Sequence, residues 1–196
     1  MRIGIYGGTF NPVHLGHVHL LREVMQTGLL DRILVMPDRT PPHKQAPDLI
    51  DGKKRFEMLQ LATMGMEGIQ VSDFELQREG KSYTYMTLRL LRELYPDDQF
   101  SLIMGADMLL SFREWRNWEE ILSGARLIAA ARDEGEYERL EQAAKDLGNT
   151  ELVRITPLPV SSTEVRAAAK EGRSLEKLVP QPVADYIREN HLYQQP

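Results

Sequence analysis

The chain has 196 residues, with 24 basic and 29 acidic side chains, no cysteine and a formal net charge of −5. This length fits one ordinary globular domain, and an apolar fraction of 42% supplies a core and argues against disorder. The lack of cysteine excludes disulfides, thiolate metal sites and cysteine nucleophiles. The acidic balance argues against binding to a nucleic-acid backbone.

No apolar run approaches the roughly 20 residues that span a bilayer, and the first residues lack the long apolar stretch of a signal peptide. We therefore expect a cytoplasmic protein without a membrane partner. The net charge does not exclude small phosphorylated ligands, because such ligands need only a few local cations and backbone amides.

Short apolar runs alternate along the chain with stretches of helical periodicity. Strands are predicted at Ile3–Tyr6, Ile33–Met36, Ile69–Leu76, Phe100–Met104, Leu127–Ala131 and Leu152–Thr156. Helices are predicted at His17–Met25, Arg55–Met64, Thr84–Leu94, Trp115–Leu122, Glu136–Leu147, Ser161–Lys170 and Val183–Asn190. This alternation predicts an α/β fold with a doubly wound, mostly parallel sheet. Ligands of such sheets bind beyond the carboxyl ends of the strands.

We expect a single domain over residues 1–196, with a core over 1–160 and a C-terminal helical segment over 161–196 that packs on the sheet. Residues 38–52 contain three prolines and no periodicity, which predicts a long loop at the ligand end. Segment 133–146 holds six acidic and two basic residues, a charge of 2 − 6 = −4. Most of the net charge is thus predicted to lie on one solvent-facing helix.

The first predicted strand runs into GGTFNPVHLGH, residues 7–17. This segment is neither the dinucleotide-binding glycine pattern nor a P-loop, which lowers the case for hydride transfer and for P-loop chemistry. It places His14 and His17 three residues apart at a predicted helix start, where N–H groups and imidazoles together favour a phosphate. The alternative is that one histidine caps the helix and the other lies on the surface.

A second segment, SSTEVR at residues 161–166, also begins a predicted helix. Ser161 and Glu164 have the spacing of a capping box, which alone would explain the pattern. A helix start is also a phosphate site, and Ser162, Thr163 and Arg166 would add two hydroxyls and a fixed cation to it.

Together the two segments resemble the G-x-F-x-P-x-H-x-G-H and S-S-T-x-x-R motifs of the nucleotidyltransferase superfamily. Further blocks resemble the bacterial nicotinate-mononucleotide adenylyltransferases over nearly the whole chain. These blocks are Pro41–Lys44, Lys81–Tyr85, Gly105–Asp107, Trp115 with Trp118, and Tyr186–Tyr193. The resemblance implies a Rossmann-like nucleotidyltransferase fold and the transfer of AMP from ATP to nicotinate mononucleotide, giving deamido-NAD and pyrophosphate.

The resemblance also implies residue roles. Catalysis would fall to His14, His17 and Arg166. ATP would be bound by Gly7, Gly8, Thr9, Phe10, Gly105, Asp107, Ser161, Ser162 and Thr163. Nicotinate mononucleotide would be bound by Lys44, Tyr83, Thr84, Trp115 and Arg132, and Mg²⁺ would be carried by the phosphates rather than by a protein site.

Simpler roles compete with several of these. Trp115 and Trp118 would share one helix face, where at least one of them packs in the core. Asp107 could cap the next helix, Tyr83 and Thr84 could end a loop and cap another, and Lys44 could be a solvated loop residue.

The sequence departs from the family pattern at two places. Asn11 stands where many relatives have Asp, which removes a charge but keeps an oxygen that can cap. Asp-Glu-Gly follows Arg132 where relatives often have Pro-Gly, which puts the role of Arg132 in question. Three alternatives to this function stay open: transfer to another acceptor, such as pantetheine phosphate or nicotinamide mononucleotide; cytidylyl transfer; and a non-catalytic nucleotide-binding module. The sequence also leaves the oligomeric state open between a monomer and a homodimer.

Overall fold

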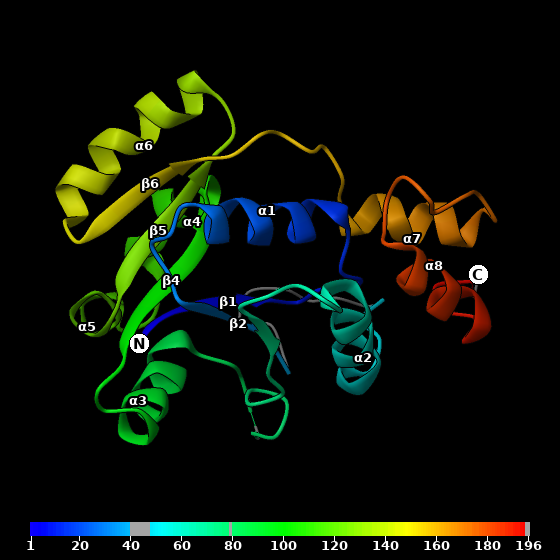
Figure 1. Cartoon of the computed structure of the whole chain (residues 1–196), viewed down its shortest axis with the longest axis horizontal. Helices are drawn as coiled ribbons and strands as arrows, with labels where there is room; N and C mark the ends of the chain where they lie inside the picture. Colours follow the sequence, from blue (N-terminus) through cyan, green and yellow to red (C-terminus); the bar gives the residue numbers. More distant parts are fainter. Residues whose placement is uncertain (40–47, 79, 195–196) are drawn as a thin grey trace.

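The computed structural model describes residues 1–39, 48–78 and 80–194. Six parallel strands form one sheet in the order β3-β2-β1-β4-β5-β6, with helices on both faces (Figure 1). The predicted doubly wound α/β fold is confirmed.

The strands are β1 (Arg2–Gly8), β2 (Arg32–Pro37), β3 (Ile69–Val71), β4 (Gln99–Gly105), β5 (Arg126–Ala131) and β6 (Thr150–Arg154). The helices are α1 (Leu15–Gln26), α2 (Gly52–Thr63), α3 (Thr84–Leu94), α4 (Ala106–Leu110), the 3₁₀ helix η1 (Phe112–Glu114), α5 (Trp118–Gly124), α6 (Glu134–Leu147), α7 (Ser162–Lys170) and α8 (Gln181–Glu189).

The strands divide their apolar side chains between two core clusters. In β2, Ile33 and Val35 join the cluster under α1, α2, α7 and α8, whereas Leu34 and Met36 join the cluster under α3, α4, α5 and α6. Successive side chains of a strand point to opposite faces, so a continuous apolar run fills both layers. This explains why the strands read as unbroken apolar segments.

Four strands contain all the residues predicted for them and extend beyond them, whereas β3 and β6 leave part of their predicted residues outside the strand. β3 ends at Val71 rather than Leu76, because the amides of Leu76 and Gln77 both donate to the carbonyl of Asp73, which closes a turn. β6 covers Thr150–Arg154 rather than Leu152–Thr156. The apolar residues past the end of β3 lie in a turn. Hydrophobicity alone does not distinguish apolar residues in a turn from apolar residues in a strand.

The C-terminal helices pack on the same side of the sheet as α1 and α2. The segment after β6 runs alongside α1 on its way to α7 (Figure 1), and side chains of α1 bind it there. Glu23 accepts from the Thr156 amide at 2.6 Å, and Nε2 of His19 lies 2.9 Å from the Thr156 carbonyl oxygen. α8 then packs against α2, where the Tyr186 hydroxyl donates to Glu57.

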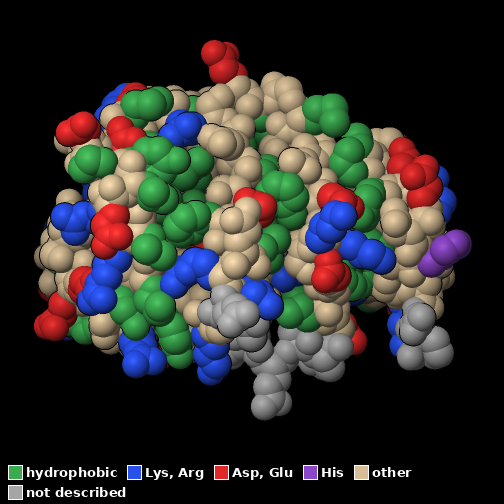
Figure 2. Space-filling model, turned by 90° about the horizontal axis from the view of Figure 1, so that it is seen from below, with side chains coloured by type: hydrophobic (Ala, Val, Ile, Leu, Met, Phe, Trp, Pro, Cys, Tyr) green, Lys and Arg blue, Asp and Glu red, His purple; other side chains and the backbone are tan. Residues whose placement is uncertain are grey.

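The surface carries mixed charges. Among the described side chains on the face seen in Figure 2, Lys and Arg alternate with acidic and apolar groups rather than forming a continuous basic field. α6 has one buried residue, Leu140, so the acidic helix faces solvent as predicted. Within the described ranges no helix is both long and apolar enough to cross a bilayer.

Candidate active site

The first motif lies at the carboxyl end of β1, beside the end of β4. A Cβ atom added to Gly7 or to Gly105 would meet no heavy atom within 4 Å beyond its chain neighbours, so both strand ends face open space. The strand order turns here, because β2 lies on one side of β1 and β4 on the other. Doubly wound sheets bind their ligands at such a switch point. Gly7 and Gly105, two of the three glycines predicted to bind ATP, therefore lie at the ligand edge of the fold.

The two motif histidines stack at the start of α1. His14 is the N-cap residue, and its amide donates to Nδ1 of His17 at 3.2 Å. Because that nitrogen accepts, the proton of a neutral His17 ring lies on Nε2, which is left as a donor. Of the alternative, one capping and one surface histidine, only the first half holds. His14 is the N-cap residue, but His17 is not a separate surface residue, because its ring stacks on that of His14.

Burial keeps both imidazoles uncharged. It lowers the pKa of His14 to about 4, and burial with the adjacent His14 ring holds the pKa of His17 well below its usual value. Nδ1 of His14 is buried and has no hydrogen-bond partner among the described residues. An orphaned buried nitrogen is a cost that a purely structural histidine avoids, which favours a functional role for the pair.

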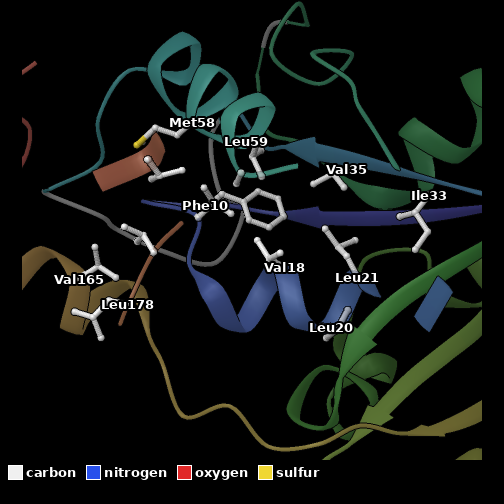
Figure 3. Packing of buried hydrophobic residues seen from close by; sticks show 14 of the residues in the cluster. Phe10, Val18, Leu20, Leu21, Ile33, Val35, Met58, Leu59, Val165 and Leu178 are labelled. Atoms are coloured by element: carbon white, nitrogen blue, oxygen red, sulfur yellow. The ribbon is translucent and has the colours of Figure 1, made fainter. Parts of the chain in front are cut away.

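Two glycines of the motif make room for aromatic rings. Phe10, with a φ of 47°, buries its ring between α1 and α2 (Figure 3), and a Cβ atom on Gly8 would come within 3.0 Å of that ring. A Cβ atom on Gly16 would come within 3.0 Å of Nδ1 of His14. The Phe10 ring lies 5.0 Å from the His17 ring and supports it from the core side. The side chain of Phe10, a predicted ATP-binding residue, is therefore part of the core.

The second motif docks directly on the first, although 150 residues separate them. Ser161 caps α7 as predicted. The Ser162 hydroxyl donates to the Pro12 carbonyl at 2.8 Å, and Nη1 of Arg166 donates to the Asn11 carbonyl at 2.8 Å. The structure thus brings the histidine pair and the predicted arginine to one place.

These contacts decide which groups of the second motif can still act on a ligand. The Ser162 proton is already donated to Pro12, so its hydroxyl is not the spare donor that the sequence suggested. Thr163 is exposed, and its Oγ1 lies 3.4 Å from Nη2 of Arg166. Arg166 makes no ion pair with the carboxylates of the described residues, which leaves its charge for a ligand.

Asn11 does not cap a helix, so that expectation was wrong. Its Nδ2 donates to the Asp48 carbonyl at 2.9 Å, and its Oδ1 accepts from the Tyr193 hydroxyl at 2.9 Å and from the Ile50 amide at 3.4 Å. An ionised Asp could not donate to Asp48, which gives Asn a physical reason to stand here. The residue joins the motif loop to the start of α2 and to the C-terminus.

A buried arginine escaped the sequence analysis. Arg55 is 1% exposed, and its guanidinium donates to the carbonyls of Thr9 (2.6 Å), Asp38 (2.7 Å) and Ile50 (3.2 Å). The Asp38 carboxylate lies 3.4 Å from Nη1 of Arg55 and accepts from the Thr9 hydroxyl at 3.0 Å. The available signal was the position of Arg55 on the apolar face of its helix, three residues before Met58.

At the end of β4, Gly105 takes the N-cap position of α4 with an extended backbone (φ −83°, ψ 172°). The alternative reading of Asp107 as that cap was therefore wrong. Asp107 lies in the first turn instead, with its side chain exposed at the ligand edge.

Three of the residues predicted to bind the acceptor, Tyr83, Thr84 and Trp115, come from two neighbouring segments. Tyr83 takes the N-cap position of α3 and Thr84 is its first residue, and neither caps the helix through its side chain. Trp115 follows η1 with an extended backbone, and its ring packs 5.5 Å from that of Phe112. The guanidinium of Arg116 lies 5.1 Å from the centre of the Tyr83 ring and joins the two segments.

The tryptophans do not share one helix face, so that expectation was wrong. Asn117, with a φ of 56°, separates Trp115 from α5, which begins at Trp118. The left-handed residue interrupts the helix, a break that the apolar periodicity of the segment conceals. Both rings are half-buried on the core around Phe112.

Arg132 follows β5 directly and is exposed. Burial raises the pKa of the partly buried Tyr6, and the charge of Arg132 opposes this rise. The Tyr6 ring lies 6.2 Å from that of His17. The altered Asp-Glu-Gly turn begins α6, with Asp133 as its cap. Lys44 lies outside the described residues.

Comparison with known proteins identifies the family of the chain. Residues 5–168 match the cytidylyltransferase-like family. A protein of Geobacter sulfurreducens is 37% identical, with 98% of each chain covered, and one of Pseudomonas aeruginosa is 36% identical, with 100% of this chain and 98% of the relative covered. Both are named "Probable nicotinate-nucleotide adenylyltransferase".

The chain belongs to the nicotinate-nucleotide adenylyltransferase family, within the cytidylyltransferase-like proteins. Two solved structures of the Plasmodium falciparum nicotinic acid mononucleotide adenylyltransferase, complexed with APC and with NaAD, share its fold. Their TM-scores are 0.82 and 0.83 at 24% identity, and 98% of this chain is covered in each. In this adenylyltransferase, the described residues contain no group of three or more His, Asp or Glu side chains that could hold a metal ion.

Proposed function

We propose that the protein transfers AMP from ATP to nicotinate mononucleotide, forming deamido-NAD and pyrophosphate in NAD biosynthesis. Family membership and the names of the full-length relatives support this reaction. The observation that carries it in this chain is the contact between the two motifs, which sets Arg166 beside the loop that leads into His14 and His17.

The ATP side is assigned to the first motif, the end of β4 and the start of α7. His14 and His17 would donate to ATP phosphates at the N-terminus of α1, with His17 at the α-phosphate. Arg166 and Thr163 would hold the β- and γ-phosphates. Gly7, Gly8, Thr9, Phe10, Gly105, Asp107, Ser161 and Ser162 complete this side, Phe10 and Ser162 through their backbone groups.

The acceptor side is assigned to the segments that meet at Tyr83 and Trp115. The Trp115 ring would stack on the pyridine, and backbone groups at Tyr83 and Thr84 would contact its substituent. Arg132 and Lys44 are the cations assigned to the rest of the mononucleotide.

The chemistry needs no strong general base, because the acceptor phosphate is already an anionic nucleophile at neutral pH. One of its oxygens attacks the α-phosphorus of ATP, a new P–O–P bond forms, and the bond to the bridging oxygen of the β-phosphate breaks to release pyrophosphate. The residues align two polyanions and stabilise the developing charge. Mg²⁺ bound to ATP would neutralise part of the phosphate charge when present.

The experiment incubates the protein with ATP, Mg²⁺ and one acceptor at a time, and measures pyrophosphate. The acceptors are nicotinate mononucleotide, nicotinamide mononucleotide and pantetheine phosphate. We expect the highest kcat/KM with nicotinate mononucleotide. A higher value with another acceptor would overturn the assigned substrate. Thermal stabilisation by ATP without turnover of any acceptor would instead indicate a non-catalytic nucleotide-binding module.

A further inference from the structure

Arg116 links the two segments assigned to the acceptor. It directly follows Trp115, and its guanidinium carbon lies 5.1 Å from the centre of the Tyr83 ring. Tyr83 in turn directly precedes Thr84, where α3 begins. A cation over an aromatic face is a favourable contact, so the stack holds the charge near the start of α3.

In the part of the chain that the structure describes, no salt bridge neutralises the charge of Arg116. Arg116 is exposed. The acids within four residues of Arg116 are Glu114, Glu119 and Glu120, and of these Glu120 binds Arg89. The first turn of α3 contains no acidic residue and its N-terminus has no side-chain cap.

We propose that Arg116 is a specificity-determining residue that favours an acceptor with an ionised carboxylate on its ring over the neutral amide counterpart. This inference rests on the proposed function, which places the pyridine between Trp115 and the start of α3. There the guanidinium and the partial positive charge of the α3 N-terminus act in the same direction. A carboxylate gains from both, whereas an amide gains little from either.

The chain offers a matched control in Arg113. Its guanidinium lies 5.6 Å from the centre of the Trp118 ring, in the same segment and in a similar stack, but it donates to the Asp146 carbonyl and lies on the α6 side. Replacing it removes the same charge and the same kind of stack without altering the cation over Tyr83.

The test compares kcat/KM for nicotinate mononucleotide and nicotinamide mononucleotide in wild type, Arg116→Gln, Arg116→Lys and Arg113→Gln. Arg116→Gln should lower the nicotinate preference by about two- to fivefold, the scale of one exposed charge interaction. Arg116→Lys should keep most of the preference, and Arg113→Gln should keep all of it. Raising the salt concentration should weaken the preference in wild type and leave that of Arg116→Gln nearly constant.

An Arg116→Gln protein that keeps the wild-type ratio overturns the inference while the proposed function stands. A variant that loses activity equally on both acceptors also overturns it, because that result indicates a positioning role. If wild type itself does not use nicotinate mononucleotide, the proposed function fails and the inference fails with it.

Discussion

The imidazole rings of His14 and His17 stack with centroids 3.6 Å apart and planes inclined by 27°. Two charged imidazoles would repel at this distance, so the packing requires at least one neutral ring. Burial favours neutrality in both. The free protein therefore presents uncharged donors at the α1 N-terminus, and the positive charge at the motif comes from Arg166 and the helix.

Replacing His17 tests its role at the α-phosphate. His17→Ala should lower kcat by about 10²-fold or more, the scale for losing one preorganised donor. His191→Asn is the control, because His191 is exposed near the C-terminus and its φ of 49° suits Asn. Pyrophosphate release measures both. A folded His17→Ala protein with near wild-type kcat would remove the residue from the mechanism.

The buried state of His14 predicts how stability depends on pH. The folded pKa of about 4 lies below the ordinary value of 6.5, so the unfolded chain binds the proton first as the pH falls. His14 therefore stabilises the fold above about pH 6.5, and this contribution is lost as the pH falls towards 4. Between about pH 7.5 and pH 5 the loss from His14 should be about 2 kcal/mol.

Urea unfolding of wild type and His14→Gln at the two pH values measures this loss. The neutral Gln side chain does not titrate, so the variant should show a free energy of unfolding that falls less with pH. Equal pH dependence in the two proteins would show that the His14 pKa is not lowered by folding.

Local periodicity predicted the six strands and all the helices except α4 and η1, although several bounds differ. That the two motifs act on one ligand was implied by their resemblance to the nucleotidyltransferase motifs and not by periodicity. The sequence did not predict features that depend on long-range pairing. The bonds from Asn11 to Asp48 and Tyr193 involve chain separations of 37 and 182 residues. Nothing in the residue types near Asn11 distinguishes these contacts from a helix cap.

The same reasoning explains the error at Trp115 and the oversight of Arg55. The segment at Trp115 has helical periodicity, but one left-handed residue, Asn117, divides it. Asn tolerates the left-handed conformation, but the presence of Asn in a sequence does not predict it. Arg55 has the spacing of a core residue, and only the structure shows three carbonyls and a carboxylate around its guanidinium.

Replacing Arg55 should destabilise the fold strongly. Arg55→Met leaves the Asp38 carboxylate and the Thr9 carbonyl without the buried guanidinium, and removing one partner of a buried pair costs about 3–5 kcal/mol. Burial lowers the pKa of Arg55, which is the expected sign of this desolvation. Arg22→Met, on the exposed face of α1, should change the free energy of unfolding by no more than about 0.5 kcal/mol. Urea unfolding compares the two, and similar small losses would contradict the role of the buried network.

Replacing two helical glycines by Ala would distinguish the effect of side-chain packing from the effect of helix propensity. Gly16 and Gly135 are each the second residue of a helix, α1 and α6. A Cβ atom on Gly135 would meet its nearest neighbour at 3.5 Å, an ordinary contact, whereas one on Gly16 would lie 3.0 Å from Nδ1 of His14. Gly135→Ala should therefore stabilise the protein by about 0.5–1 kcal/mol through helix propensity alone.

Gly16→Ala should lack that gain, because the added methyl group displaces the His14 ring by a few tenths of an ångström. The displacement should lower kcat by about three- to tenfold, less than the roughly 10²-fold cost of a misplacement near 1 Å. Gly135→Ala should leave kcat unchanged, since α6 begins away from the histidine pair. Pyrophosphate release and urea unfolding of wild type, Gly16→Ala and Gly135→Ala test both predictions. If Gly16→Ala behaves like Gly135→Ala in both measurements, Gly16 is not required to make room for the His14 imidazole.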